Sequence, residues 1–181
     1  TFLSEPLFPD VKFLRGWPAL CIGSDGQTLY AAGIGRSDDE WGKNSTNLPC
    51  VWRVDTATRK AEGFLGDPKE YGKEKDRFTA PRGMAAAKGL LYVADPGADR
   101  VAVFKESDRS FAGEIKVKNP QSVGVDPASG AVYVCAYTGR GTADLVKFNG
   151  FASTQEVCRL TLPKTFESGP QRIAVDASAQ P

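Results

Sequence analysis

Apolar residues alternate with polar ones in short segments that recur in phase along the chain. Four segments start with proline and continue as an apolar strand, at residues 18–22, 81–85, 120–126 and 170–176. After the first three, a tight polar turn leads into a second strand with a tyrosine at the matching place, Tyr30, Tyr92 or Tyr133. Third strands are expected at 51–54, 101–104 and 145–148, and fourth strands around residue 64 and at 111–117 and 157–162. This pattern predicts short antiparallel strands, and no segment shows sustained helical periodicity.

Four strands per unit, repeated at roughly 40 to 50 residues, match the blade of a β-propeller. The predicted fold class is all-β, with about three to four four-stranded blades and a ring that this chain leaves incomplete. A β-sandwich has strands at similar intervals, but it does not explain why proline and tyrosine recur in phase. The expected organisation is the end of a preceding blade or an N-terminal extension (1–16), a blade (17–66), an inter-blade loop (67–80), two blades (81–118 and 119–163) and the start of a further blade (164–181).

The second unit carries a family resemblance. Its segments 81–84 (PRGM), 91–95 (LYVAD) and 99–104 (DRVAVF) resemble an NHL repeat. The resemblance implies a six-bladed propeller or a close relative, and it implies no single activity, because fold does not fix function. It is looser in the other two units, where Gly33 and Ala136 stand at the position of Asp95.

A structural role is predicted for Asp95 and Arg100. Asp95 lies where the second strand of its unit ends, and Arg100 begins the third. A carboxylate at this place can accept hydrogen bonds from the guanidinium and from turn amides. We therefore expect the two residues to hold the hairpin together.

Three complete units and one opening strand do not close a ring, since propellers have roughly four to eight blades. An open ring would expose sheet edges and apolar blade faces. The remaining blades are expected on the rest of a longer chain, on a second subunit or through self-association. The end of the chain just after a first strand favours a fragment of a longer protein.

The long connections are expected at one end of the blades, which we call the long-loop face. They are the second-to-third connections 34–49 and 137–143 and the inter-blade connections 66–80 and 163–169. Long loops in compact domains often carry function, so we place any binding surface there. The candidate binding residues are Asp38, Asp39, Glu40, Trp41, Tyr71, Arg77, Phe78, Tyr137 and Arg140.

Two groups of these candidates have a chemical rationale. Asp38, Asp39 and Glu40 offer clustered carboxylates, which could bind Ca²⁺. The alternative is a solvated acidic loop without an ion, so no cofactor is expected and the metal stays unassigned. Trp41, Tyr71 and Phe78 either form an aromatic contact surface or anchor the loops.

Composition narrows the chemistry further. The chain has no histidine, which excludes Ser-His-Asp and Cys-His mechanisms within its 181 residues. The formal net charge is +1, and charges of both signs alternate over residues 69–77, so a nucleic-acid partner is not expected. No apolar run reaches the roughly 18 residues of a membrane span.

The four cysteines fall on different predicted strands and show no C-x-x-C spacing. A metal or redox motif is therefore not expected, and the default prediction is buried free thiols. Cysteine usage leaves the compartment open. The absence of an initiator methionine fits a processed mature chain and a fragment equally well. The location stays unknown, with a secreted or periplasmic one slightly favoured.

Three functions remain compatible with these observations. The first is a non-catalytic propeller that binds a protein or glycan through the long-loop face. The second is a metal-dependent, lactonase-like hydrolase or lyase whose remaining site residues lie on blades outside this chain. The third is a subunit that completes a propeller ring in an assembly.

Overall fold

The computed structural model describes residues 14–15, 19–36, 46–58, 60–139, 141–162 and 172–176. These residues form three four-stranded antiparallel sheets, each with its strands in chain order from one edge to the other. Blade 1 contains β2 (Ala19–Ile22), β3 (Leu29–Ala32), β6 (Cys50–Asp55) and β7 (Lys60–Gly66). Blade 2 contains β8 (Met84–Ala87), β9 (Leu90–Asp95), β10 (Arg100–Lys105) and β11 (Phe111–Lys116). Blade 3 contains β12 (Pro120–Val125), β13 (Val132–Gly139), β14 (Thr142–Gly150) and β15 (Ser153–Leu162).

Other regular structure in the described residues is short. Strands β1 (Leu14–Arg15), β4 (Gly35–Arg36) and β5 (Thr46–Asn47) form a small antiparallel sheet. One 3-10 turn, η1 (Pro96–Ala98), joins β9 to β10. This part of the chain has no helix with the length and hydropathy of a membrane span.

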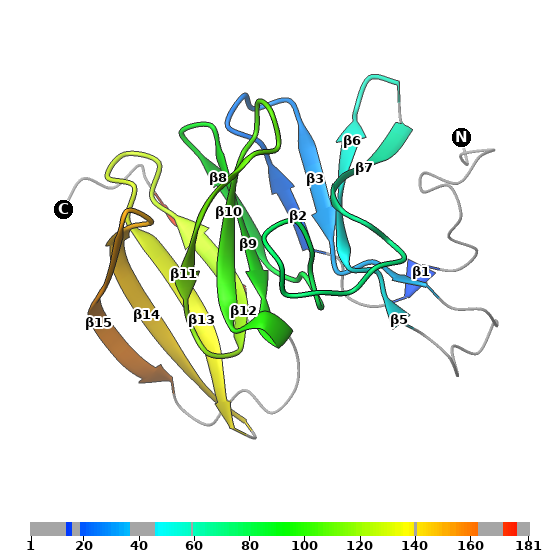
Figure 1. Ribbon diagram of the computed structural model, residues 1–181. Coiled ribbons are helices and arrows are strands. Elements are labelled where there is room, and N and C mark those ends of the chain that lie inside the picture. The colour runs from blue at the N-terminus through cyan, green and yellow to red at the C-terminus, as the bar shows by residue number, and fades with distance from the viewer. Residues whose placement is uncertain are drawn as a thin grey trace.

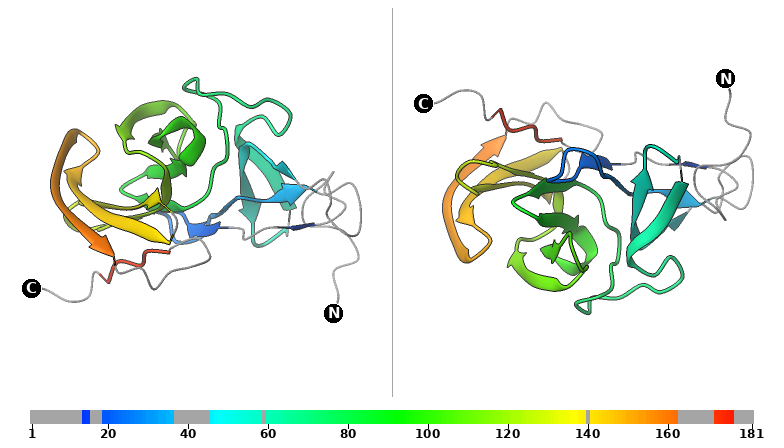
Figure 2. Two further views of the ribbon diagram at one scale, coloured as in Figure 1. Left: turned by 90° about the horizontal axis from the view of Figure 1, so that it is seen from below. Right: turned by 90° about the horizontal axis from the view of Figure 1, so that it is seen from above.

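The three sheets are arranged as consecutive blades of a β-propeller (Figures 1 and 2). The first strands lie innermost, because β8 contacts both β2 and β12. The last strands, β7, β11 and β15, form the outer edges. The described strands form an open arc of three blades and not a closed ring, in agreement with the predicted fold class.

The recurring tyrosines occupy equivalent places in the blades. In each blade the tyrosine lies on the second strand, with register partners on the first and third strands. Tyr30 packs in the hydrophobic cluster between blades 1 and 2, and Tyr92 packs in the cluster between blades 2 and 3. The side chain of Tyr133 is half-buried and belongs to neither cluster. Each tyrosine therefore points toward the side where the next blade packs or would pack.

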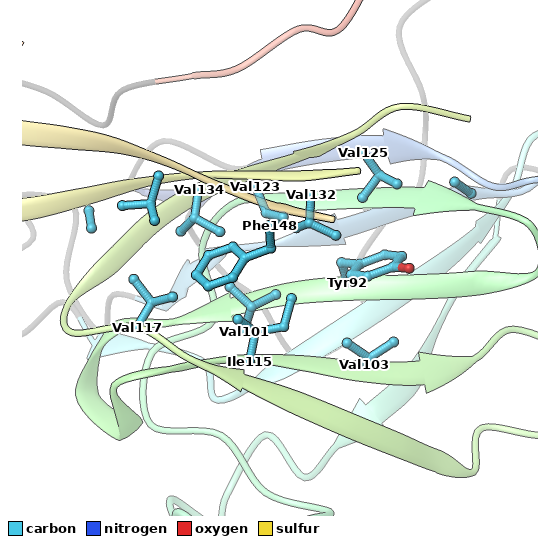
Figure 3. Packing of buried hydrophobic residues seen from close by; sticks show 13 residues of the cluster. Tyr92, Val101, Val103, Ile115, Val117, Val123, Val125, Val132, Val134 and Phe148 are labelled. Atoms are coloured by element: carbon cyan, nitrogen blue, oxygen red, sulfur yellow. The ribbon is translucent and has the colours of Figure 1, made fainter. Parts of the chain in front are cut away.

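The largest core lies between blades 2 and 3 (Figure 3). Branched side chains from both sheets fill it, including Val101 and Ile115 of blade 2 and Val132 and Val146 of blade 3, all fully buried. Phe151, in the turn between β14 and β15, reaches across to Tyr92 with ring centroids 6.4 Å apart. Burial of β-branched residues is thus the main hydrophobic contribution between blades 2 and 3.

One predicted long loop is a hairpin. The connection 137–143 was expected to be long, but β13 extends to Gly139 and β14 starts at Thr142. The pairs Tyr137 with Ala143 and Gly139 with Thr142 continue the ladder to the tip. The prediction was wrong because it relied on alternating apolar residues, which this part of the two strands lacks. Backbone hydrogen bonds hold the strands together here, with a further hydrogen bond between the Thr138 and Thr142 hydroxyls, 3.0 Å apart.

Candidate functional site on the long-loop face

Residues 67–80 make up most of the connection from blade 1 to blade 2, which runs from residue 67 to residue 83 and is the longest inter-blade segment that the structure describes. It is folded on itself, because Asp67 accepts hydrogen bonds from the backbone N–H groups of Lys69, at 2.7 Å to its carboxylate, and of Glu70, at 3.2 Å to its carbonyl. Further along, the Gly72 N–H donates to the Phe78 carbonyl at 3.0 Å. We call this segment the 67–80 loop.

A buried carboxylate holds the C-terminal end of this loop. Asp95, at the end of β9, is fully buried and accepts hydrogen bonds from the backbone N–H groups of Thr79 (3.1 Å) and Ala80 (3.0 Å). The Thr79 hydroxyl donates to the same carboxylate. Several N–H and O–H donors satisfy a buried carboxylate and fix the backbone that carries them.

A buried guanidinium holds the middle of the loop. Arg100, at the start of β10, donates to the Glu74 carbonyl at 2.8 Å and to the Arg77 carbonyl at 2.6 Å. It also lies 3.4 Å from a carboxylate oxygen of Glu114 and 3.8 Å from one of Asp95. The structure therefore brings Asp95 and Arg100 together, as the sequence predicted. Their main partners, however, are in the 67–80 loop and not in the β9–β10 turn.

Phe78 is an anchor of the loop and does not contribute to its surface. Its ring is fully buried and lies 5.7 Å from the Phe104 ring, measured between centroids. Assigning Phe78 to a binding surface was wrong, because a side chain without exposed area cannot touch a partner. Gly66 makes room for the ring, since a Cβ at this position would lie 2.9 Å from Phe78 and 2.6 Å from the Pro49 carbonyl oxygen.

Tyr71 and Arg77 are accessible to solvent, among exposed charged residues of the loop such as Lys73 and Asp76. Tyr71 is 52% exposed, and its hydroxyl donates to the Asn47 carbonyl at 2.9 Å. Arg77 forms an ion pair with Glu70 at 2.7 Å, and both side chains are about half exposed. The loop thus presents an aromatic ring among charges of both signs, and Asp95 and Arg100 hold its backbone in place.

The other candidate residues are distributed differently. Asp38, Asp39, Glu40, Trp41 and Arg140 lie outside the described residues. Tyr137 is half-buried beside a hollow of about 210 Å³ between blades 2 and 3, lined also by Val117, Lys118, Ala136, Thr138 and Arg159. Within the described ranges, no group of three or more His, Cys, Asp or Glu side chains could hold a metal ion.

Sequence reasoning missed a larger hollow at the opposite end of blade 1. It measures about 600 Å³, and the turns after β2 and β6 line it together with the adjoining ends of β6 and β7. Its polar lining residues include Asp25, Arg53, Asp55 and Glu62. Hydrogen bonds, first from the Thr28 hydroxyl and then from turn amides, lower the pKa of Asp25 to about 2. This carboxylate stays ionised near neutral pH and accepts hydrogen bonds within its own turn, so it is a poor general acid.

The cysteines follow the prediction only in part. All four are free, and Cys50 and Cys135 are buried. Burial is the main cause that raises the pKa of Cys50 to about 12 and that of Cys135 to about 11. Cys21 is half-buried, and Cys158 is exposed because it lies on the outer strand β15, so the prediction of buried thiols was wrong for these two.

The class defined by these sheets is the β-propeller, and comparison with solved structures agrees. No family model and no curated protein sequence matches the chain. Hydrazine synthase of Kuenenia stuttgartiensis has a TM-score of 0.55 and 19% identity over 88% of this chain and 39% of its own. A chain in a structure of a nidogen/laminin complex has a TM-score of 0.52 and 15% sequence identity, over 80% of this chain and 46% of its own. A luciferin-regenerating enzyme has a TM-score of 0.54 and 14% sequence identity, over 86% of this chain and 48% of its own.

These similarities concern the fold alone. The chain spans less than half the length of each of the three structures. Two of them are enzymes by their titles and one belongs to a complex of two proteins, so they do not select one function for this chain.

Proposed function

We propose that this chain is part of a non-catalytic β-propeller of the NHL type that binds a protein partner through the 67–80 loop. The observation that carries the proposal is the combination of an exposed Tyr71 and Arg77 with two buried charged residues beneath them. Asp95 and Arg100 together bind four backbone groups of the loop.

Preorganisation supports a binding role for the loop. A loop that is already ordered loses little conformational entropy when a partner binds. Tyrosine and arginine are the residue types enriched at energetic hot spots of protein interfaces. A glycan is less favoured, because the Tyr71 hydroxyl is already bonded to Asn47 and small polar ligands are usually held in concave sites.

Site-specific photo-crosslinking tests this proposal. A photoreactive residue replaces exposed Lys69, beside Tyr71, and as a matched control replaces exposed Thr56 in the β6–β7 turn at the opposite end of blade 1. In an extract of the source organism, we expect position 69 to capture one protein that position 56 does not capture.

Competition makes the result specific. Unlabelled wild-type protein should abolish the capture at position 69, and Y71A should compete about tenfold less well, since loss of one hot-spot residue costs at least 1–2 kcal/mol. No capture at position 69, or equal capture at positions 69 and 56, would overturn the proposal. Binding to a glycan array that Y71A abolishes would replace the protein partner with a glycan.

A second candidate function is assembly into a complete ring. The face of blade 3 that points away from blade 2, which we call the open face, carries Tyr133, Leu145 and Lys147 in partly exposed positions. Ile173 and Val175 lie against β12 on this face, because a Cβ at Gly124 would be 2.6 Å and 3.0 Å from their methyl groups. The placement matches the first strand of a following blade. A photoreactive residue at Lys147 should capture another polypeptide, and a lack of intermolecular capture would contradict assembly.

A further inference from the structure

The outermost strand of blade 3 differs from those of the other two blades. Strand β15 has ten residues, whereas β7 has seven and β11 has six. Two of the large exposed hydrophobic side chains, Val157 (50%) and Leu160 (57%), lie on it. The strand contains no proline or lysine, the residues that commonly protect a free sheet edge. Because β15 is the edge strand of its sheet, no further strand of the described residues pairs with its outer side.

The order of residues in β15 is self-complementary. In an antiparallel pair of two β15 strands related by a twofold axis between Val157 and Cys158, Glu156 of each copy stands opposite Arg159 of the other. Directly opposite residues share a face of the sheet, and opposite charges there stabilise the pair. The same register places Val157 opposite Cys158, so the centre of the pair is apolar.

This register requires Glu156 and Arg159 to lie on the same face of the sheet, and a β-bulge in β15 places them there. Phe148 pairs with Glu156 and Lys147 pairs with Cys158, so Val157 is the additional residue of a bulge. As a result Glu156 and Arg159 lie on the same face, where they form an ion pair at 2.6 Å within the chain. Both residues keep about two fifths of their side-chain surface exposed and can bind a second pair of charges.

We propose that two copies of this chain associate edge to edge through β15, forming a continuous antiparallel sheet across a twofold axis. The interface uses the outer edge of blade 3, which is radially outside the ring, so it is independent of the 67–80 loop and of any further blades. A closed twofold interface of this kind is the commonest arrangement in protein oligomers.

The association state of purified protein tests the inference. Sedimentation equilibrium over a concentration series should give a monomer–dimer equilibrium for the wild type. E156R places two arginines opposite each other at both ends of the pair, and we expect the dissociation constant to rise at least about tenfold. E62R is the matched control, because Glu62 is an exposed glutamate on the outer strand β7 that is also paired with an arginine, Arg53.

Disulfide trapping identifies the strand involved. Cys158 would lie next to its own copy across the axis, at a Cα separation of about 5.5–6 Å, which a disulfide can bridge. Mild oxidation should give a covalent dimer in the wild type and in E62R, none in C158S, and a strongly reduced yield in E156R. If E156R fails to fold, E156Q removes the attraction without adding repulsion and should weaken association less. A wild type that stays monomeric, or a dimer that E156R or E156Q leaves unchanged, would overturn the inference.

Discussion

Blades 2 and 3 both carry an ion pair between their third and fourth strands, with the charges exchanged. In blade 2, Arg100 at the start of β10 pairs with Glu114 of β11 at 3.4 Å. In blade 3, Asp144 near the start of β14 pairs with Arg159 of β15 at 2.8 Å. The two pairs occupy the same register in their sheets. In these two blades the position therefore accepts an ion pair with either charge on the third strand.

The two blades differ in what precedes them. Blade 2 follows the 67–80 loop, and its Asp95 binds that loop. Blade 3 follows a connection of three residues, 117–119, and Ala136 stands at the place of Asp95. There, the Tyr137 N–H donates to the Asn119 carbonyl at 3.1 Å, and a backbone bond is sufficient. A buried carboxylate is thus present where a long loop must be held in place.

The repeated tyrosines of the two blades differ in their exposure to solvent. Tyr92 is 4% exposed under the cover of blade 3, and Tyr133, at the equivalent place, is half-buried with the Lys147 ammonium 5.6 Å from its ring centroid. One repeat position is therefore core in one blade and partly surface in the next.

The largest expected effect comes from truncating these two tyrosines. Y92A removes a large buried ring from the core between blades 2 and 3 and should lower the free energy of unfolding by about 4 kcal/mol. Y133A removes a ring that is partly exposed and should cost about 1 kcal/mol. Urea denaturation followed by circular dichroism measures both. Equal losses would show that the open face is as well covered as the interface between blades 2 and 3.

A somewhat smaller effect is expected at Asp95. D95N weakens the bonds to Thr79 and Ala80 and removes the charge beside buried Arg100. The free energy of unfolding should therefore fall by about 3 kcal/mol. The 67–80 loop should also become more sensitive to trypsin, which cleaves after its lysines and arginine. D126N is the control, since Asp126 is a half-buried turn aspartate with bonds to Ala128 and Ser129 and no contact with the 67–80 loop. An unchanged rate of cleavage in D95N would contradict the holding role.

The exchanged ion pair in blade 3 predicts a pH dependence. The hydrogen bond from Arg159, and secondarily that from Thr161, lowers the pKa of Asp144 below its ordinary value of 3.8. A carboxyl with a lowered folded-state pKa stabilises the protein above the unfolded-state value and loses this contribution as the pH falls through the folded-state value. D144N should therefore lower the free energy of unfolding by about 1 kcal/mol at neutral pH, a small loss because Arg159 is partly solvated. The difference between the wild type and D144N should shrink below about pH 4. A difference that does not change with pH would exclude the ion pair as its cause.

Sequence periodicity could locate the three sheets because proline and tyrosine mark the same strands in each unit. It could not find the contacts of the 67–80 loop. Phe78 follows a run of charged residues, and only the folding of the loop onto Phe104 shows that its ring is buried. Thr79 binds Asp95 across sixteen positions of chain, and no local pattern reports such a pair. The Tyr71–Arg77 surface was predicted from residue type, whereas its rigidity is a tertiary property.

The smallest effect, with no change in stability, concerns two thiols on the open face of blade 3. Cys135 and Cys158 lie on this face, on β13 and β15, but Cys135 is buried and Cys158 is exposed. Burial, with a contribution from Asp144, raises the pKa of Cys135 to about 11. At pH 8 only about one Cys135 thiol in a thousand would be ionised, and the thiolate is the reactive form. Labelling with iodoacetamide, followed by mass spectrometry, should therefore modify Cys158 at least about a hundredfold faster than Cys135. Similar rates would mean that the inner part of the open face is accessible to solvent. Slow labelling of both would mean that another polypeptide covers the outer part too.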